Sequence, residues 1–291
     1  MLIKLPDIIN TEYKEFCVGQ RKRLATASGC CFISENIIAI NHLVGQRLYL
    51  VYFNMSKNEY QIISQIDTTF EYKKCPTELV TTRNNIIATS NFYHSISTYK
   101  ITDYKIYKLD DYHFQNFGYC HGIKYYTNNI ICFTTMLTPN NVCFFDLINR
   151  NILYKFDHQI GRPKDICFIS DNQMIIIYTC NDPSGQPYKL MNSYVHLVQF
   201  NIEDKNSKII SEFIISDCQL DACVFHKGLI YIVTVKDAED SVQILKIEND
   251  TLTYHDQITG FNIPHGLSIQ NNLFAVTNYC DNTVKIMELS S

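Results

Sequence analysis

PHGLSIQNNLFAVTNYCDNTVKIMEL, residues 264–289, is one copy of a pattern that recurs along this chain. A His-Gly pair lies at the start of the copy, and two short apolar runs follow it, separated by Asn271-Asn272. Paired Asn residues tolerate the left-handed backbone of a tight hairpin, so the two runs predict a pair of antiparallel strands. The run TVKIMEL, which follows a polar turn, predicts a third strand.

The same pattern occurs six times in the chain. The copies begin at Ser28, Thr77, His121, Lys164, Asp221 and His265. Their starts are 49, 44, 43, 57 and 44 residues apart. A third strand follows the first two in every copy, and a fourth follows in most copies. Four strands at a period of about 44 residues predict the blades of a β-propeller.

The repeats therefore predict an all-β fold, a six-bladed β-propeller with four-stranded blades in a single domain over residues 1–291. A lone blade cannot bury both of its faces, so blades stack around an axis. Apolar runs such as IIAI and MIIIY are typical of strands that are buried on both sides. Because the sixth copy ends after its third strand, we expect residues 11–19 to supply the outer strand of the last blade and to close the ring.

Composition and charge exclude several classes of protein. The 291 residues carry a net charge of −4, and the only basic cluster is Arg21-Lys22-Arg23. Nucleic-acid binding needs clustered Lys and Arg over a wider surface, so we expect no nucleic-acid partner. No apolar run approaches the roughly 20 residues of a membrane-spanning helix, so we expect no membrane partner.

The N-terminal sequence and the cysteines indicate in which cellular compartment the protein is expected. Pro6 and Asp7 lie where a secretory signal would be apolar. Most of the 12 cysteines lie inside apolar runs, and no CxxC pair occurs, which is typical of buried reduced thiols. We therefore expect a cytoplasmic monomer. A secreted effector without a recognisable signal peptide is the alternative.

Two stretches of the sixth copy resemble known repeats. VTNYCDNTVKIMEL (276–289) resembles the YVTN-type repeat, and PHGLSIQNNLFAV (264–276) is similar to the opening of NHL and streptogramin-lyase-like units. WD-type repeats match poorly because their Trp-Asp dipeptide is absent. The resemblance extends over about residues 28–289 and implies a propeller, but it specifies function only weakly. Some six-bladed relatives are lactonases or lyases with a divalent metal in the channel, and many others bind only proteins or glycans.

The opening pairs of the copies predict a cluster of polar side chains at one mouth of the channel. In a blade of this kind, the opening pair and the loop after the second strand lie at the same end of the ring. A concave mouth with convergent polar groups is the default place for a ligand. The candidate ligand-binding residues are Glu78, His121, Lys164, Asp165, Asp221, His265 and Asn278.

Two interpretations of the histidines remain open. Imidazole and carboxylate groups suit a divalent ion such as Mg, Ca, Mn or Zn, which is the only cofactor that we consider. Its candidate ligands are His121, Asp165, Asp221 and His265. Alternatively, the His-Gly pairs are structural, with Gly permitting a close approach and His bonding to a neighbouring blade. GxSxG, HExxH and phosphate-binding glycine loops are absent from the sequence.

The fourth copy contains a long connection, CNDPSGQPYKLMNSY (180–194), on the same face. Such a loop contacts a partner or is a tolerated insertion, and Asp182, Tyr188 and Lys189 are its candidate contact residues. The sequence favours a non-catalytic propeller that binds a protein, a small molecule or a glycan at the mouth bearing His121 and His265. The alternative is a metal-dependent enzyme, a lactonase-like hydrolase or a lyase, with its site in the channel.

Overall fold

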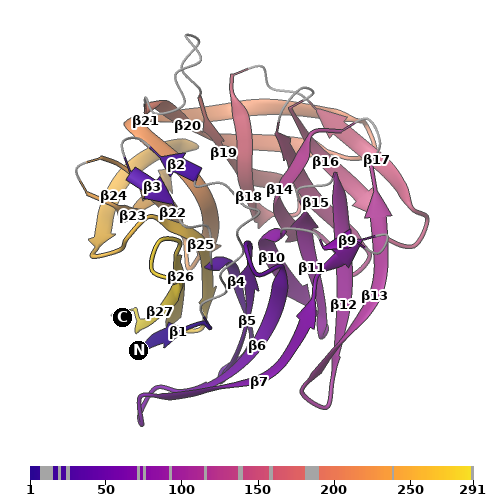
Figure 1. Ribbon diagram of the computed structural model, residues 1–291. Coiled ribbons are helices and arrows are strands. Elements are labelled where there is room, and N and C mark those ends of the chain that lie inside the picture. The colour runs from indigo at the N-terminus through magenta and orange to yellow at the C-terminus, as the bar shows by residue number, and fades with distance from the viewer. Residues whose placement is uncertain are drawn as a thin grey trace.

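The computed structural model describes residues 1–6, 16–18, 21–23, 27–70, 73–74, 77–91, 94–114, 117–136, 140–156, 160–180, 190–237 and 239–289. Every regular element in these ranges is a β-strand, and the pairings are antiparallel throughout. Over the same ranges, the protein has no helix with the length and apolarity needed to cross a bilayer. Figure 1 shows the sheets arranged around a central axis.

Three four-stranded sheets each come from one continuous stretch of chain. The first contains β4 (Ala27–Ser34), β5 (Ile37–His42), β6 (Arg47–Asn54) and β7 (Glu59–Asp67). The second contains β10 (Thr77–Arg83), β11 (Ile86–Asn91), β12 (Ser95–Thr102) and β13 (Lys105–His113). The third contains β14 (Tyr119–Tyr125), β15 (Ile130–Met136), β16 (Asn141–Asp146) and β17 (Asn151–Phe156).

The remaining sheets are less regular. A fourth four-stranded sheet contains β25 (Pro264–Gln270), β26 (Leu273–Asn278), β27 (Thr283–Glu288) and β1 (Leu2–Lys4). A seven-stranded sheet contains β18 (Arg162–Ser170), β19 (Gln173–Thr179), β20 (Met191–Asn201), β21 (Asn206–His226), β22 (Leu229–Val235), β23 (Ser241–Glu248) and β24 (Thr251–Thr259). Two short hairpins pair β2 (Phe16–Val18) with β3 (Arg21–Arg23) and β8 (Thr69–Phe70) with β9 (Lys73–Lys74).

The prediction of six separate four-stranded blades is wrong, because two expected blades form one sheet. β21 is 21 residues long, and it pairs with β20 as far as Cys218 and with β22 from Gln219 onward. Its sequence contains neither Gly nor Pro, the residues that most often end a strand. Asp217, with a φ of 48°, is its one residue with positive φ, and the strand continues through this position.

The prediction that residues 11–19 supply the outer strand of the last sheet is also wrong. That strand is β1, in which Ile3 lies opposite Val284 of β27. Ile3 of this strand and Leu5, which follows it, are 0% and 2% exposed, so the N-terminal segment contributes two side chains to the core. Of residues 11–19 the structure describes only Phe16–Val18, which pair with β3.

The innermost strands surround the axis. β4, β10, β14, β18, β21 and β25 contact one another in this order, and β25 contacts β4 in turn. The second strands lie behind them and are almost completely buried, as the apolar runs predicted. Fully burying one Ile side chain contributes about 1.5–3 kcal/mol, so runs such as Ile175–Ile177 stabilise the packing between sheets.

Candidate functional site in the central channel

Two His-Gly pairs occupy equivalent places on opposite strands of the innermost circuit. His121-Gly122 lies on β14 and His265-Gly266 lies on β25. His121 is 1% exposed and His265 is 2% exposed. Their ring centroids are 5.4 Å apart, so the two imidazoles meet across the channel axis.

Both pairs need glycine because a neighbouring strand lies directly against the backbone. A Cβ atom at Gly122 would lie 2.5 Å from the Lys164 carbonyl oxygen. A Cβ atom at Gly266 would lie 2.6 Å from the Ser28 carbonyl oxygen. Both distances are well below van der Waals contact, and the atoms met are backbone atoms that cannot move aside easily.

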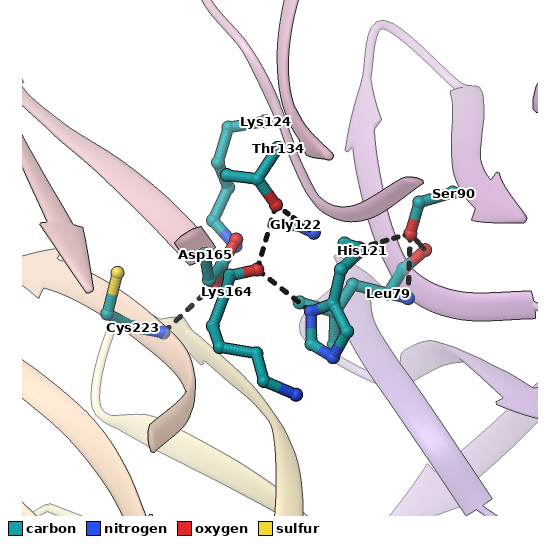
Figure 2. A network of polar contacts seen from close by, with 9 residues as sticks. All are labelled: Leu79, Ser90, His121, Gly122, Lys124, Thr134, Lys164, Asp165 and Cys223. Atoms are coloured by element: carbon teal, nitrogen blue, oxygen red, sulfur yellow. Dashed lines mark hydrogen bonds and ion pairs between the residues drawn. The ribbon is translucent and has the colours of Figure 1, made fainter. Parts of the chain in front are cut away.

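The same two carbonyl oxygens orient the histidines. His121 Nδ1 lies 2.8 Å from the Lys164 oxygen (Figure 2), and His265 Nδ1 lies 2.8 Å from the Ser28 oxygen. A carbonyl oxygen only accepts hydrogen bonds, so Nδ1 carries a proton in both rings, and in the neutral form of each ring the lone pair is on Nε2. The histidines thus bond to a neighbouring innermost strand, as the structural interpretation of the His-Gly pairs proposed.

A threonine on the second strand of each sheet supports the glycine. Thr134 Oγ1 accepts a hydrogen bond from Gly122 N at 2.8 Å and donates one to the Lys164 oxygen at 3.0 Å (Figure 2). Thr277 makes the same two contacts in the other sheet, at 2.6 and 3.0 Å. These threonines were missed from the sequence, where isolated Thr residues near strand ends carry little signal.

An ion pair lies beside the histidines. Lys164 Nζ is 3.2 Å from Asp221 Oδ1, and the Asp221 side chain is fully buried. Gln219 Nε2 donates to the same carboxylate oxygen at 2.6 Å. The structure therefore brings together four of the candidates, which are His121, Lys164, Asp221 and His265.

Within this cluster, the ligand atoms of His121, Asp221 and His265 lie within 4.8 Å of one another. Burial lowers the pKa of His121 well below its usual range, and the nearby Lys164 and His265 lower it further, against the opposing effect of Asp221. The imidazole is therefore neutral, which is the form that can bind a cation.

Asp165 lies outside this group of ligand atoms. Its Oδ2 is 2.9 Å from Lys124 Nζ and accepts a hydrogen bond from Cys223 N at 3.0 Å (Figure 2). Burial raises the pKa of the Asp165 carboxyl, although Lys124 and the Cys223 amide act in the opposite direction. Its contacts join three innermost strands, β14, β18 and β21, which is a structural role.

Asn278 also serves the local structure. It is 5% exposed, its Oδ1 accepts a hydrogen bond from Asn262 N at 3.2 Å, and its Nδ2 donates to Thr283 Oγ1 at 3.1 Å. These contacts fix the turn between β26 and β27 against the segment that precedes β25. The side chain of Glu78 on β10 lies outside the described residues, as do Asp182, Tyr188 and Lys189 of the long connection.

His265 packs against a buried apolar cluster. Tyr279 stacks on its ring with a centroid distance of 4.7 Å, and Tyr279 is itself only 3% exposed. Leu43, Val235 and Ile263 complete the buried part of this cluster. The imidazoles are thus enclosed by packed side chains at the mouth where we expected a ligand to bind.

The other end of the channel contains a pocket of about 440 Å³. The fifth residue of every copy lines it, so each innermost strand contributes one side chain. These residues are Phe32, Thr81, Tyr125, Phe168, Phe225 and Ile269. Lys124 and Arg83 also line this space, which we call the channel-end pocket. Cys30 lies there too, and burial raises the pKa of its thiol to about 12, so it is not an activated nucleophile.

Comparison with known proteins identifies the fold. No family model matches the chain, and no curated protein matches its sequence. The WD40 propeller domain of Doa1 is similar, with a TM-score of 0.61, 10% identity, and coverage of 95% of this chain and 97% of that one. The C-terminal WD40 domain of Sif2 has a TM-score of 0.55, 9% identity, and coverage of 96% and 98%.

A chain of the mitotic checkpoint complex is similar as well, with a TM-score of 0.58, 8% identity, and coverage of 88% of this chain and 74% of that one. The Doa1 and Sif2 neighbours are WD40 propellers, and the specific resemblance to YVTN, NHL or streptogramin-lyase-like repeats is not confirmed. Identity at this level shows the fold alone. Together with the circuit of innermost strands, these likenesses show that the chain is a β-propeller.

Proposed function

We propose that this chain is a non-catalytic propeller that binds a protein partner, and that the channel-end pocket receives an apolar side chain of that partner. The observation that carries the proposal is the half-buried apolar lining of this concave site. Tyr125, Phe168, Phe225 and Ile269 are each neither buried nor fully exposed. Partly exposed aromatic residues around a concavity are typical of the anchor sites of protein interfaces.

The charges around the pocket add specificity to the proposal. The Arg83 guanidinium donates to Asn128 Oδ1 at 2.7 Å and to the Tyr126 carbonyl oxygen at 3.2 Å, which holds it at the rim. Lys124 also lines the pocket, and its ammonium group pairs with Asp165. A partner segment that carries an apolar residue next to an acidic one would complement both features.

The mouth bearing His121 and His265 is a weaker candidate for ligand binding. Each histidine is at most 2% exposed, so a ligand would first have to displace the side chains that cover them, such as Tyr279 on His265. The same burial argues against the lactonase or lyase alternative, because a substrate carbonyl would need direct access to the imidazoles and the carboxylate. The similarity to a chain of the mitotic checkpoint complex, which is a protein assembly, supports a protein partner over a glycan or a small molecule.

Selection of random peptides on the purified protein tests the proposal. We expect selected peptides to lose at least tenfold in affinity when Phe225→Asp or Phe168→Asp places a charge in the pocket. Tyr254→Asp is the matched control, because Tyr254 is 50% exposed on β24, outside the pocket lining. Peptides that bind both pocket variants as tightly as the unmodified protein would show that the pocket is not the binding site.

A further inference from the structure

We propose that His121, Asp221 and His265 bind a late first-row divalent cation, of the zinc type, on the axis of the channel. The three residues come from β14, β21 and β25, and their ligand atoms lie within 4.8 Å of one another. All three side chains are buried. This inference is independent of the proposed function, because the channel-end pocket lies further along the same innermost strands.

The orientation of the imidazoles supports this site. Histidines that bind metals almost always donate the N–H of the other ring nitrogen to a carbonyl or carboxylate oxygen, which fixes the tautomer. His121 and His265 both have this contact, from Nδ1 to the carbonyl oxygens of Lys164 and Ser28. In the neutral form of each ring, the proton on Nδ1 leaves the lone pair on Nε2, the nitrogen that a metal would bind.

The spacing of the ligand atoms also suits a metal ion. Zinc bonds of about 2.0–2.2 Å hold two ligand atoms about 3.3 Å apart in a tetrahedral site. Ligand atoms that already lie within 4.8 Å need only small rotations to reach this spacing. Lys164 Nζ and Gln219 Nε2 both contact Oδ1 of Asp221, so both side chains border the proposed site.

The chemistry of the three ligand groups favours zinc over calcium and magnesium. Calcium and magnesium prefer an all-oxygen ligand set, whereas two imidazoles and one carboxylate suit zinc, cobalt or nickel. Lys164 competes for the same carboxylate, since its ammonium group is 3.2 Å from Asp221 Oδ1. Its flexible four-carbon stem lets the ammonium group move away when a dication arrives.

Titration with cobalt and zinc tests this site. Untagged protein stripped with EDTA should bind Co²⁺ in a 1:1 ratio, with visible d–d bands of a four- or five-coordinate site, and Zn²⁺ should displace it. Zn²⁺ should also raise the melting temperature, whereas Mg²⁺ and Ca²⁺ should not. Failure of the unmodified protein to bind either Co²⁺ or Zn²⁺ in a 1:1 ratio would overturn the proposal.

Substitutions identify the ligands. In His121→Asn and His265→Asn the amide can still donate to the backbone carbonyl, but the second ring nitrogen is gone, so each should weaken Zn²⁺ binding at least 100-fold. His255→Asn is the control, because His255 lies at an exposed position of β24. Lys164→Met should tighten Zn²⁺ binding at least fivefold by removing the competing charge. Unchanged affinity in both histidine variants contradicts the assignment.

If the asparagine variants do not fold, X-ray absorption on the zinc-loaded unmodified protein identifies the zinc ligands. Two imidazoles in the zinc coordination shell are the expected result. Fewer than two imidazoles would exclude this site, because His121 and His265 are the two histidines of the proposed set.

Discussion

Individual glycines determine how closely the innermost strands pack. The Cβ position of Gly122 is 2.5 Å from the Lys164 carbonyl oxygen, so any side chain there would push β14 and β18 apart. That separation would also stretch the bond from His121 Nδ1 to the same oxygen. The His-Gly pair is therefore one structural unit, in which the first residue bonds to the neighbouring strand and the second permits its approach.

We predict that Gly122→Ala lowers the free energy of unfolding by about 2–4 kcal/mol, as overpacking of a rigid core does. Gly228→Ala is the matched control, because Gly228 has a φ of +82° and no atom within 4 Å of its Cβ position. It should cost only about 1–2 kcal/mol, from backbone strain. Urea unfolding followed by circular dichroism measures both values, and equal losses would contradict the packing argument.

We expect the stability of the protein to depend on pH through the buried histidine His196. The side chain of His196 on β20 is fully buried beside the Tyr178 ring, and its Nε2 is 2.9 Å from Glu212 Oε2. Burial lowers the pKa of His196, although Glu212 acts in the opposite direction. In the unfolded chain the pKa returns to about 6.5, so the unfolded state binds more protons as the pH falls below this value. Stability contributed by this group is therefore present above about pH 6.5 and is lost on acidification.

We expect His196→Gln, which keeps a donor for Glu212 but does not titrate, to lose less stability than the unmodified protein between about pH 7 and pH 5. Urea unfolding in the presence of EDTA measures this difference. Identical pH profiles would show that His196 does not contribute to acid sensitivity.

At the scale of elements, the N-terminal strand covers the edge of the last sheet. β1 pairs with β27, and Ile3 packs in a core cluster that includes Ile38 and Val284. Tyr60 on β7 accepts a hydrogen bond from the Lys4 amide and donates one to the Lys4 carbonyl, at 3.3 and 3.2 Å. This three-residue strand thus connects the last sheet to the first.

We predict that Ile3→Ala costs about 2–4 kcal/mol of unfolding free energy, because it leaves a cavity in this cluster. Leu2→Ala is the matched control, since Leu2 is 55% exposed on the same strand and should change stability by less than about 0.5 kcal/mol. Thermal and urea unfolding distinguish the two, and a large loss in the control would indicate that the whole strand detaches.

These elements also show what the sequence could and could not predict. The apolar second strands, such as Gln173–Thr179, were recognisable because they are buried on both faces. β1 was not, because three residues are too few to show an alternating pattern. The continuity of β21 was hidden for a different reason. The repeat places a boundary at Asp221, whereas the strand continues through this position and only changes its partner, from β20 to β22, between Cys218 and Gln219.

In the molecule as a whole, hydroxyl groups on second strands bond to the innermost strands that follow them around the axis. Ser90 on β11 donates to the His121 carbonyl oxygen (Figure 2), and Thr179 on β19 donates to the Leu220 oxygen at 3.1 Å. Thr134 and Thr277 make equivalent bonds. Each of these bonds joins the second strand of one repeat copy to the innermost strand of the following copy.

The convergence of His121, Asp221 and His265 followed from the repeat, because equivalent positions of successive copies face the same axis. The hydroxyl bonds and the channel-end pocket could not be predicted from the repeat. The fifth residue of each copy, which lines the pocket, is Phe, Thr, Tyr, Phe, Phe or Ile, so its shared position is visible only once the strands are placed. Position in a repeat is thus easier to infer than the chemistry at that position.

The hydroxyl bonds predict that the sheets unfold as one unit. Thr134→Val and Thr277→Val should each cost about 1–3 kcal/mol, because each leaves a buried glycine N–H without its acceptor. Thr251→Val, at an exposed position, should be nearly neutral.

Since the two buried sites lie on opposite sides of the axis, the double variant should show the sum of the two losses within about 0.5 kcal/mol and a single transition. Because the protein has no Trp, circular dichroism and tyrosine fluorescence are the two probes, and transitions that do not coincide would show that the sheets unfold separately.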